Sequence, residues 1–404
     1  MRHKLNFEDT KIAFSLKSNK EVKWANVLFT IIGNRQLTAV ARPITMFLLF
    51  IRFPIIPILK RTVFKQFCGG ESILECKPVI TNMFNKKKVC SILDYSIEGK
   101  ESEEQFNFTL NIILKTFDFA KSLEATPFLV FKGTGLGRFG IFEKVSKKEA
   151  LNAREREEWE NIEARFDKIC KQCSQTPNIK VMIDAEESWI QPAIDGLAEK
   201  MMSKYNKNRV VVFNTVQLYR WDRLEYLKML NQKANKENHL VGIKLVRGAY
   251  MEKERERAAK KHYQSPICNN KQATDENFNK GVYYCLQNLN VFELFLGTHN
   301  ELSSQLLVDL MNKAEIRHND NRIWFGQLYG MGDHLSFNLA DMGYNTAKYL
   351  PFGPVKEVIP YLLRRAEENT SVGAQTSREL YLIKKEIARR NKSTNNYMAD
   401  RILS

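Results

Sequence analysis

The chain has 404 residues, enough for one large domain or two of ordinary size, and its 44% hydrophobic and 27% charged residues are typical of a globular protein. Seven cysteines, an odd number, exclude a framework in which every cysteine is paired in a disulfide. The formal net charge of +16 predicts either an attraction to nucleic acid, an anionic membrane or an acidic ligand, or only a well-solvated surface.

The N-terminal residues 1–85 are expected to be helical, with turn signals at 32–34 (IGN) and 68–70 (CGG). No apolar core follows the basic start, so no signal peptide is expected. The most apolar stretch, residues 43–59, is interrupted by Arg52, Pro54 and Pro57. A membrane span needs about 20 clean apolar residues, so this stretch is expected to be a core helix or a surface-docking arm.

From about residue 90, short apolar runs alternate with longer amphipathic segments. Eight runs are found, at residues 90–96, 127–133, 181–187, 210–217, 240–248, 292–300, 323–330 and 347–353. Continuous apolar runs are typical of parallel strands buried on both faces, and eight strand–helix units predict a (β/α)8 barrel. A doubly wound open sheet is the alternative, but KGTGLGRFG (132–140) has the wrong glycine spacing for a dinucleotide fingerprint.

One cysteine motif and the C-terminal segment have plain interpretations. Cys170 and Cys173 form a lone CKQC with no second pair, which argues against a zinc or redox site, and the cysteines fit a reducing compartment. Residues 377–404 are expected to form a basic helix with a polar end. This tail is either an ordinary solvated helix or an attachment to an anionic membrane surface.

Polar side chains gather toward the C-terminal ends of the apolar runs, which in a barrel form the mouth of the active site. They are Lys132, Asp184, Glu186, Gln217, Lys244, Arg247, Thr298, His299, Asn300, Gln327 and Tyr349. Such a set on nearly every strand predicts an enzyme. In the fifth run, two cations precede Gly248 and Ala249, whose small size lets a ligand approach closely. These groups suit a flat heterocycle with a pyrophosphate.

The segment PYLLRRAEEN (360–369) predicts a helix in which Tyr361, Arg364, Arg365 and Glu368 share one face. Two guanidinium forks can bind one small carboxylate, whereas the alternative is a basic patch on a surface helix.

Taken in order, IDAEE, VVFNTVQLY, KLVRGAY, GTHN, FGQLYGMGD, KYLPFGPV and YLLRRAEEN resemble the motifs of the flavin-dependent proline dehydrogenases, in the monofunctional branch. The likeness covers nearly the whole chain. It implies a distorted (β/α)8 barrel that binds FAD at residues 86–376, after an N-terminal helical arm at 1–85 and before the basic tail at 377–404. A final helix would lie over the barrel mouth. The implied reaction oxidises L-proline to 1-pyrroline-5-carboxylate and passes the electrons through FAD to a membrane quinone.

The resemblance also implies roles for single residues. Asp184 and Lys244 are the expected catalytic residues, with Asp184 positioning the cationic groups. The expected substrate-binding residues are Lys132, Tyr250, Leu328, Tyr349, Tyr361, Arg364 and Arg365. The expected FAD-binding residues are Ala185, Gln217, Lys244, Arg247, Gly248, Ala249, Lys271, Thr298, His299 and Glu368. No metal site and no nucleic-acid partner are expected.

Departures from the bifunctional branch leave some points open. The fifth-strand cations here run Lys244 and then Arg247, in the reverse order, so either one is a candidate for the flavin's reactive edge. Met251 replaces a tryptophan of that branch, so its adenine stacking is not carried over. With no aldehyde dehydrogenase half seen in the chain, a separate pyrroline-5-carboxylate dehydrogenase is expected to take the product.

Three alternative functions follow from the same residues. Hydroxyproline dehydrogenase activity would need room for a hydroxyl group, which the bulk of Tyr349 disfavours. A barrel lyase would use Lys132 or Lys244 as a Schiff base, and a binding protein would use only the basic surface. The expected location is the cytoplasmic side of a bacterial inner membrane as a peripheral protein, with the matrix side of the mitochondrial inner membrane as the alternative.

Overall fold

The structure is a computed structural model that describes residues 5–34, 36, 43–44, 54–95, 101–371 and 373–402. Near the C-terminus it describes side chains up to residue 365 and from 377 to 393. The chain divides into two compact units. One unit is Cys90–Gly326, and the other joins Met1–Val89 to Gln327–Ser404.

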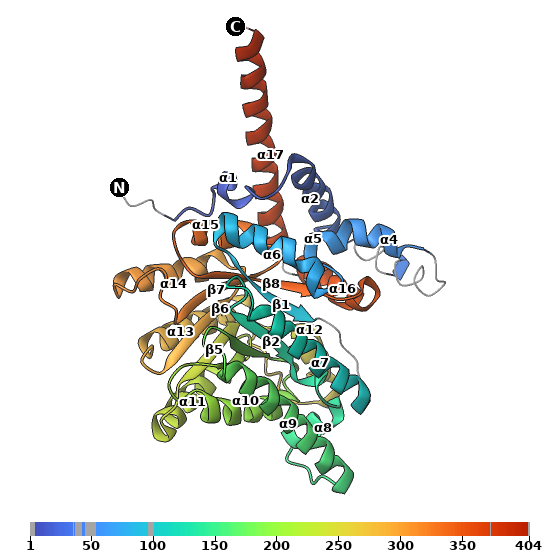
Figure 1. The fold of residues 1–404 in the computed structure, drawn as a ribbon, viewed down its shortest axis with the longest axis vertical. Helices are drawn as coiled ribbons and strands as arrows, with labels where there is room; N and C mark the ends of the chain where they lie inside the picture. Colours follow the sequence, from blue (N-terminus) through green and yellow to red (C-terminus); the bar gives the residue numbers. More distant parts are fainter. Residues whose placement is uncertain are drawn as a thin grey trace. The chain divides into compact units, whose positions relative to one another are not determined.

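Eight parallel strands close into a barrel in chain order, β1 to β8 (Figure 1). The strands are β1 (Cys90–Tyr95), β2 (Phe128–Lys132), β3 (Lys180–Asp184), β4 (Val212–Gln217), β5 (Val241–Val246), β6 (Phe292–Gly297), β7 (Ile323–Leu328) and β8 (Thr346–Phe352). All eight predicted runs are strands, and the predicted (β/α)8 class is confirmed. β4 and β8 are buried along their whole length, as expected of strands covered on both faces.

Helices separate the strands within Cys90–Gly326. They are α7 (Glu103–Ala120), α8 (Phe139–Ser146), α9 (Ala153–Ser174), α10 (Gln191–Tyr205), α11 (Arg223–Glu237), α12 (Met251–Lys261), α13 (Lys271–Gln287) and α14 (Glu301–Lys313). A side-chain cap at the first turn sets the start of α7, α9, α13 and α14. Asn152, for example, caps α9 in a reciprocal capping box with Glu155.

Aromatic side chains fill the interior of the barrel at the starts of the strands. The ring of Phe128 meets those of Phe213, Phe295 and Trp324 edge to face, with centroids 5.7, 5.4 and 5.0 Å away. The same end of the barrel also holds an ion pair between Lys180, the first residue of β3, and Glu293 on β6. The C-terminal ends of the strands are where such barrels place their sites.

The other unit contains β8 with most of the remaining helices. These are α1 (Thr10–Ala13), α2 (Asn19–Ile32), α4 (Ile56–Leu59), a π-helical turn (Lys60–Phe64), α5 (Lys65–Phe67), α6 (Ile73–Lys87), α15 (Asp333–Asp341), α16 (Val355–Ser371) and α17 (Gly373–Ile402). Its core packs residues of α2, α5, α16 and α17 together, including Phe29, Phe67, Val358 and Leu382.

The helical character predicted for 1–85 agrees with the described helices, and Gly33 ends α2 as its turn signal predicts. The helix expected after residue 377 lies within α17, which continues to Ile402 through the polar sequence that was expected to follow the helix. Most of the apolar stretch 43–59 lies outside the described residues. The placement of a final helix over the barrel mouth stays a prediction.

Candidate functional site

The best-defined polar contact among the predicted site residues joins two barrel strands. Asp184, the last residue of β3, accepts a hydrogen bond from the ammonium group of Lys244 on β5. The side chains are only 16% and 6% exposed, so little water screens the pair. Both predicted catalytic residues thus meet at one place. The pairing holds a cation and a carboxylate on the inside of the barrel.

Arg247, which follows β5, has a second set of contacts. Its guanidinium donates to Asp275 at 2.8 Å, to the hydroxyl of Thr298 at 2.9 Å and to Ser303 at 3.0 Å. The group also stacks on the ring of Phe278, 4.3 Å from the centroid. Burial lowers the pKa of Arg247, while Asp275 opposes that shift. These contacts fix a cation next to Thr298, another predicted cofactor residue.

Gln217 ends β4 and is 2% exposed. Its amide nitrogen donates to the carbonyl oxygen of Glu186 at 2.9 Å. The side-chain carbonyl oxygen of Gln217 is buried without a hydrogen-bond donor. A buried acceptor that lacks a partner costs folding free energy unless a ligand donates to it.

Glu186 connects several elements near this amide. Its carboxylate accepts hydrogen bonds from the backbone nitrogen of Thr134 at 2.9 Å and from the Thr134 hydroxyl. Its own backbone nitrogen donates to Gln191 on α10 at 2.8 Å. Burial raises the pKa of Glu186 to about 7, although nearby Lys132 and the Thr134 hydrogen bonds lower it. Glu186 therefore ties the turn after Lys132 to the ends of β3 and β4.

The three residues after Glu186 attach α12 to the same turn. Glu187 accepts from Lys253, and the backbone nitrogen of Ser188 donates to the fully buried Glu254 at 2.6 Å. Trp189 lies under the guanidinium of Arg257, with 4.3 Å between that group and the ring centroid. The strand-end pattern includes Glu186 but predicts no role for it. Glu254 and Ser188 lie off that pattern, so only the fold reveals them.

Gly248 and Ala249 are exposed, and the backbone of Gly248 has a φ of 142°. A Cβ at Gly248 would lie 2.4 Å from a ring carbon of Tyr219, so no side chain fits here. The ring of Tyr219 therefore fills the space where a side chain of residue 248 would lie, and the room for a ligand beside Gly248 and Ala249 stays a prediction. Tyr250, the next predicted residue, is partly buried at the start of α12.

The remaining predicted residues of the Cys90–Gly326 unit differ in their settings. Lys132 and Ala185 are partly buried, and so is His299, which follows the buried Thr298. Lys271, in contrast, is 66% exposed and donates to Asp275 at 2.5 Å on its own helix, α13. Asp275 therefore links Lys271 to Arg247.

The other unit holds the predicted substrate residues Leu328, Tyr349, Tyr361, Arg364 and Arg365. Tyr361 and Arg365 lie on one face of α16, as predicted, with the guanidinium 5.1 Å from the ring centroid. Arg365 is 9% exposed, and Arg364 is partly buried. Tyr349 is 8% exposed, and its carbonyl oxygen accepts from the backbone nitrogen of Tyr329 at 2.8 Å.

Not every predicted residue is placed in detail. Leu328 ends β7 and is partly buried. Glu368 lies in α16, and its side chain falls outside what the structure describes.

A buried ion cluster adjoins Tyr349 in the sequence. Lys348 is fully buried and pairs with Asp333 at 2.7 Å, and Asp333 also pairs with Lys17 at 2.8 Å. The Lys348 ammonium donates to the carbonyl oxygen of Met331 at 2.6 Å as well. The motif residues Asp333 and Lys348 therefore fasten the N-terminal segment to β8.

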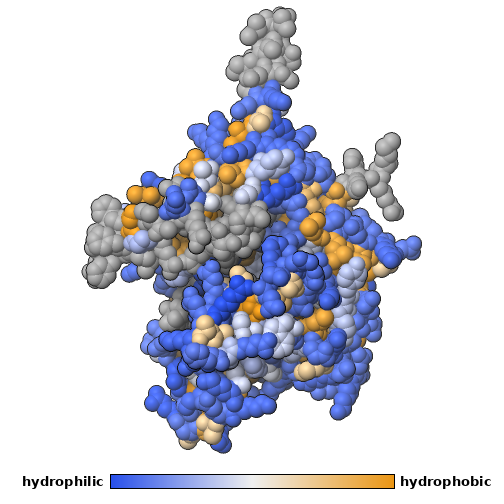
Figure 2. Space-filling view, turned by 180° about the vertical axis from the view of Figure 1, so that it is seen from behind, coloured by the Kyte–Doolittle hydropathy of each residue, from blue (hydrophilic) through white to orange (hydrophobic). Residues whose placement is uncertain are grey.

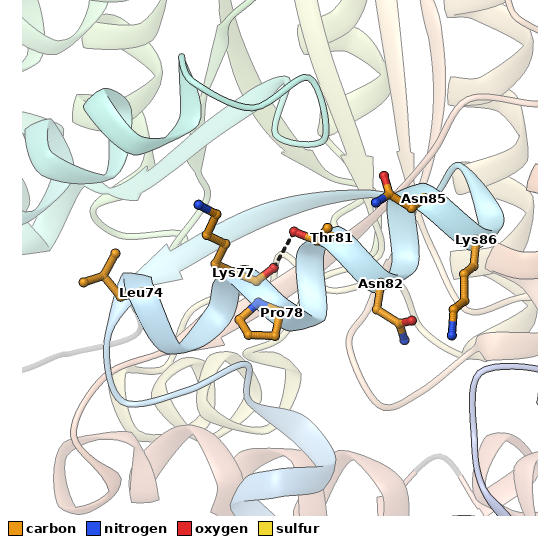
Figure 3. A pocket seen from close by; sticks show the side chains of 7 residues that line it. All are labelled: Leu74, Lys77, Pro78, Thr81, Asn82, Asn85 and Lys86. Atoms are coloured by element: carbon orange, nitrogen blue, oxygen red, sulfur yellow. Dashed lines mark hydrogen bonds between the residues drawn. The ribbon is translucent and has the colours of Figure 1, made fainter.

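The hollow in Figure 3 is unrelated to these residues. It is lined by Leu74, Lys77, Pro78, Thr81, Asn82, Asn85 and Lys86, all on α6 (Figure 3). None of them belongs to the predicted site, and a surface formed by one helix gives little enclosure for a ligand.

The sequence model of the proline dehydrogenase family matches residues 80–378, more than half of the chain and every strand of the barrel. The chain belongs to the proline dehydrogenase family. Family membership supports an oxidoreductase that acts on proline. The resemblance seen in the motifs is thereby confirmed.

Several curated relatives are similar to this chain in sequence. The carbapenem antibiotics biosynthesis protein CarD of Pectobacterium carotovorum subsp. carotovorum is 35% identical over 325 residues, which are 80% of this chain and 83% of the relative. The mitochondrial proline dehydrogenase 1 of Dictyostelium discoideum is 33% identical over 376 residues, 82% of this chain and 65% of the relative. The mitochondrial proline dehydrogenase 1 of Arabidopsis thaliana is 31% identical over 378 residues, which are 83% of this chain and 76% of the relative.

Solved structures support the same fold. Proline utilization A (PutA) from Bdellovibrio bacteriovorus matches with a TM-score of 0.67 at 19% identity. The match covers 91% of this chain but only 37% of the PutA chain. At this identity the likeness supports the barrel fold of the family and carries no residue roles.

The described residues show neither a membrane-spanning helix nor a cluster of metal-ligating side chains. No helix there is both long and apolar enough to cross a lipid bilayer. Within those same ranges, no three His, Cys, Asp or Glu side chains are grouped so that they could hold a metal ion. Cys170 and Cys173 are both fully buried, and burial raises the pKa of Cys173 to about 12. A raised pKa keeps the Cys173 thiol protonated, and because the thiolate is the reactive form, this argues against a redox role.

Proposed function

We propose that this protein is a flavoenzyme that oxidises L-proline to 1-pyrroline-5-carboxylate. The observation that carries the proposal is the family match over all eight strands, whose C-terminal ends hold polar residues. We propose further that the electrons pass from FAD to a membrane quinone, with the protein bound peripherally at the membrane. A separate pyrroline-5-carboxylate dehydrogenase would take the product, in a route of proline catabolism.

The residues of the barrel fit FAD. The buried carbonyl oxygen of Gln217 lacks a donor, and the isoalloxazine ring carries an N–H group. Gly248 and Ala249 are exposed and have little or no side chain, and Arg247 beside them is a cation held by Asp275. The residues that would hold FAD are Ala185, Gln217, Lys244, Arg247, Gly248, Ala249, Lys271, Thr298, His299 and Glu368. When bound, FAD supplies the acceptor of a hydride.

The substrate residues are proposed to bind proline by its carboxylate. Arg364 and Arg365 offer two guanidinium forks, and Lys132 adds a third cation. Tyr349 and Tyr361, with Leu328 and Tyr250, would form the walls around the ring. A carboxylate held at three points leaves the ring little freedom, which places one carbon for reaction.

The chemistry needs the ring nitrogen in its neutral form. A hydride leaves carbon 5 and a proton leaves the nitrogen, so that a C=N double bond forms between them. Several cations around the substrate disfavour the protonated amine and thus favour the reactive form. Lys244, held by Asp184, is proposed to stabilise negative charge that develops during the transfer.

The pairing of Lys244 with Asp184 also bears on the Schiff-base alternative. A lyase needs a lysine amine that is free to attack its substrate, whereas the amine of Lys244 is in contact with the carboxylate of Asp184. The observed pair therefore favours an electrostatic role for Lys244. The relative CarD is named for carbapenem biosynthesis, so a biosynthetic route remains the alternative to catabolism.

One experiment tests cofactor and substrate together. The visible spectrum of the purified protein should show flavin bands that bleach when L-proline is added without air. 4-Hydroxyproline at the same concentration should bleach them far more slowly, because Tyr349 crowds a 4-hydroxyl group. A colourless protein that borohydride inactivates with its substrate would instead identify the lyase.

The location of the protein is part of the proposal. We place it at the cytoplasmic face of a bacterial inner membrane, and the mitochondrial names of the eukaryotic relatives favour the matrix side as the alternative. Fractionation of the source cells, with and without a high-salt wash, distinguishes a peripheral membrane protein from one that does not bind membranes.

A further inference from the structure

Helix α2 has apolar residues on two faces, which is more than its packing requires. Val22, Ala25, Leu28, Phe29 and Ile32 point into the core, where the Phe29 ring meets that of Phe67 at 6.1 Å. On the opposite side, Trp24, Val27 and Ile31 are 38%, 47% and 41% exposed. Their spacing of three and four residues places them in one stripe along the helix. A surface helix normally presents polar residues there.

A second apolar patch lies in the same unit, on α4. Ile56 and Ile58 are 36% and 58% exposed, and Pro57 between them is exposed as well. The chain continues from α4 into Phe64 and Phe67, which share the hydrophobic core with α2. Two neighbouring elements of one core thus both carry apolar side chains on the outside. We call the exposed residues of α2 and of the segment 54–67 the α2–α4 face.

The charges of the α2–α4 face are nearly all positive. Residues 19–32 and 54–67 contain five basic residues, Lys20, Lys23, Lys60, Arg61 and Lys65, and one acidic residue, Glu21. All five basic residues are exposed. The ammonium nitrogen of Lys65 lies 3.6 Å from a carboxylate oxygen of Glu21, and Lys60 forms an ion pair with Glu71. The linking sequence 35–53 adds three arginines and no Asp or Glu.

The combination identifies the kind of partner. Apolar side chains with a tryptophan, next to lysine and arginine, are typical of helices that lie in the interface of an anionic bilayer. A second copy of the chain would place two basic surfaces against each other, which like charges disfavour. Figure 2 shows several hydrophobic patches between hydrophilic residues on the side of the molecule that it draws, so exposed hydrophobic residues alone do not distinguish the α2–α4 face. The exposed lysines and Arg61 next to its apolar residues distinguish this face.

We propose that the α2–α4 face docks this protein on the surface of an anionic lipid bilayer. Trp24, Val27, Ile31 and Ile58 would enter the headgroup region, while the lysines contact the phosphates. The inference rests on the proposed transfer of electrons to a membrane quinone, and it names the surface that brings the enzyme to that acceptor.

The test uses the full chain with its flavin and vesicles of two compositions. One is pure phosphatidylcholine, and the other has roughly three parts phosphatidylcholine to one part phosphatidylglycerol. Co-sedimentation without substrate should show binding to the anionic vesicles that is about tenfold tighter than to the neutral ones. Equal binding to both compositions, or none to either, would overturn the proposal.

Two matched variants locate the surface. Val27→Glu with Ile31→Glu should weaken binding to the anionic vesicles by about tenfold or more, because it removes apolar contacts and adds repulsion. The control is Phe108→Glu with Leu302→Glu, which changes two residues that are 53% and 79% exposed in the other unit. The control should bind like the unchanged protein. Its failure to bind, with the α2 variant binding normally, would place the surface elsewhere and contradict the proposal.

The enzymatic activity of each variant and its molecular mass in solution are measured together with vesicle binding. Proline oxidation with a soluble dye as acceptor should be the same in both variants and the unchanged protein, since no site residue is altered. If none of them oxidises proline yet vesicle binding depends on Val27 and Ile31, the proposed function fails and the docking face stands. If the α2 substitutions instead convert a dimer into a monomer in solution, the occupant is a second copy and the docking proposal is overturned.

Discussion

Asp184 and Lys244 form an ion pair across the barrel, although β4 lies between their strands. The side chains of Asp184 and Lys244 are only 16% and 6% exposed, so both are mostly shielded from water. Removing one partner of such a pair leaves the other as an uncompensated charge, which costs more than the loss of the contact itself. The two residues should therefore behave as one element in both stability and catalysis.

A double-mutant cycle tests this coupling. Asp184→Asn and Lys244→Met should each lower kcat/KM for proline by an amount worth about 2–5 kcal/mol. The double variant should lose much less than the sum of the two single losses. Kinetics with a soluble dye give the numbers. Lys228→Met, which changes one partner of an exposed pair with Glu225, serves as the control and should leave kcat/KM unchanged. Strictly additive losses at Asp184 and Lys244 would contradict the coupling.

The paired arginines of α16 are expected to act mainly on substrate binding. Arg365→Met and Arg364→Met should each raise the KM for proline, because a charged partner of the carboxylate is lost at a cost of about 2–5 kcal/mol. Flavin content should stay unchanged. Lys356→Met removes an exposed cation of the same helix and should leave KM as it is. An Arg365→Met enzyme with an ordinary KM would rule out the carboxylate clamp.

Glu186 should make the stability of the protein depend on pH. Burial raises its pKa from 4.5 to about 7, so the folded state binds this proton more tightly than the unfolded chain does. Its contribution to stability is fully present below about pH 4.5 and is lost as the pH rises to about 7. Glu186→Gln removes that dependence. Urea unfolding at several pH values should show the variant gaining stability relative to the unchanged protein across this window.

The matched control for Glu186 is Glu157→Gln, which changes an exposed carboxylate on α9. Its difference from the unchanged protein should be nearly flat across the same pH values. A flat difference for Glu186→Gln as well would mean that the carboxyl group stays ionised in the folded protein, contrary to the effect of its burial.

The barrel could be predicted because each strand is a continuous apolar run. The run at 240–248, for example, corresponds to β5 (Val241–Val246), and the polar residues directly after it follow the strand end. This pattern is local, so the sequence displays it directly. The pairing of Asp184 with Lys244 is not local, because it depends on which strands stand next to each other. The family resemblance implied that Asp184 positions the cationic groups, but the sequence could not show that Lys244, and not another cation, is its partner.

The residues that support the site were harder to predict. Ser188 and Glu254 are 66 positions apart and meet only when α12 packs beside the turn after β3. Lys348 and Asp333 belong to recognisable motifs, yet their charges gave no sign that they would be buried together. A buried charge is predicted poorly from sequence because its partner comes from another element of the fold.

The ion cluster of Lys17, Asp333 and Lys348 should stabilise the protein at neutral pH. Asp333→Asn leaves Lys348 fully buried without its anion, which should cost about 3–5 kcal/mol in the free energy of unfolding. The control is Asp341→Asn, at the other end of α15 from Asp333. The Asp341 side chain is 48% exposed, and its carboxylate lies 3.9 Å from the ammonium nitrogen of Lys87. Losing this surface pair should cost less than about 1 kcal/mol. Urea unfolding compares the two. Equal losses would mean that the cluster contributes no more than a surface pair.

The same cluster sets a pH dependence of opposite sign to that of Glu186. Burial alone would raise the pKa of Asp333, but Lys17 and Lys348 outweigh it and hold the pKa well below its ordinary value of 3.8. The stabilisation is thus present above the ordinary pKa and is lost as the pH falls below it. Acid unfolding of Asp333→Asn should therefore be less steep than that of the unchanged protein, whereas Asp341→Asn should keep the original slope.

Gly248 offers the sharpest test of the cofactor side of the barrel. Alanine there would be strained at a φ of 142°, and its Cβ would lie 2.4 Å from the ring of Tyr219. Either Tyr219 or the backbone after Arg247 must move, and the proposed flavin contacts move with it. Gly248→Ala should therefore lower the flavin content of the purified protein and reduce kcat.

Gly196→Ala is the control, because nothing lies within 4 Å of a Cβ built at that α10 position. It should retain flavin and gain about 0.5–1 kcal/mol of stability as a helical alanine. If Gly248→Ala kept its full flavin content and kcat, the turn after β5 could not be part of the cofactor site.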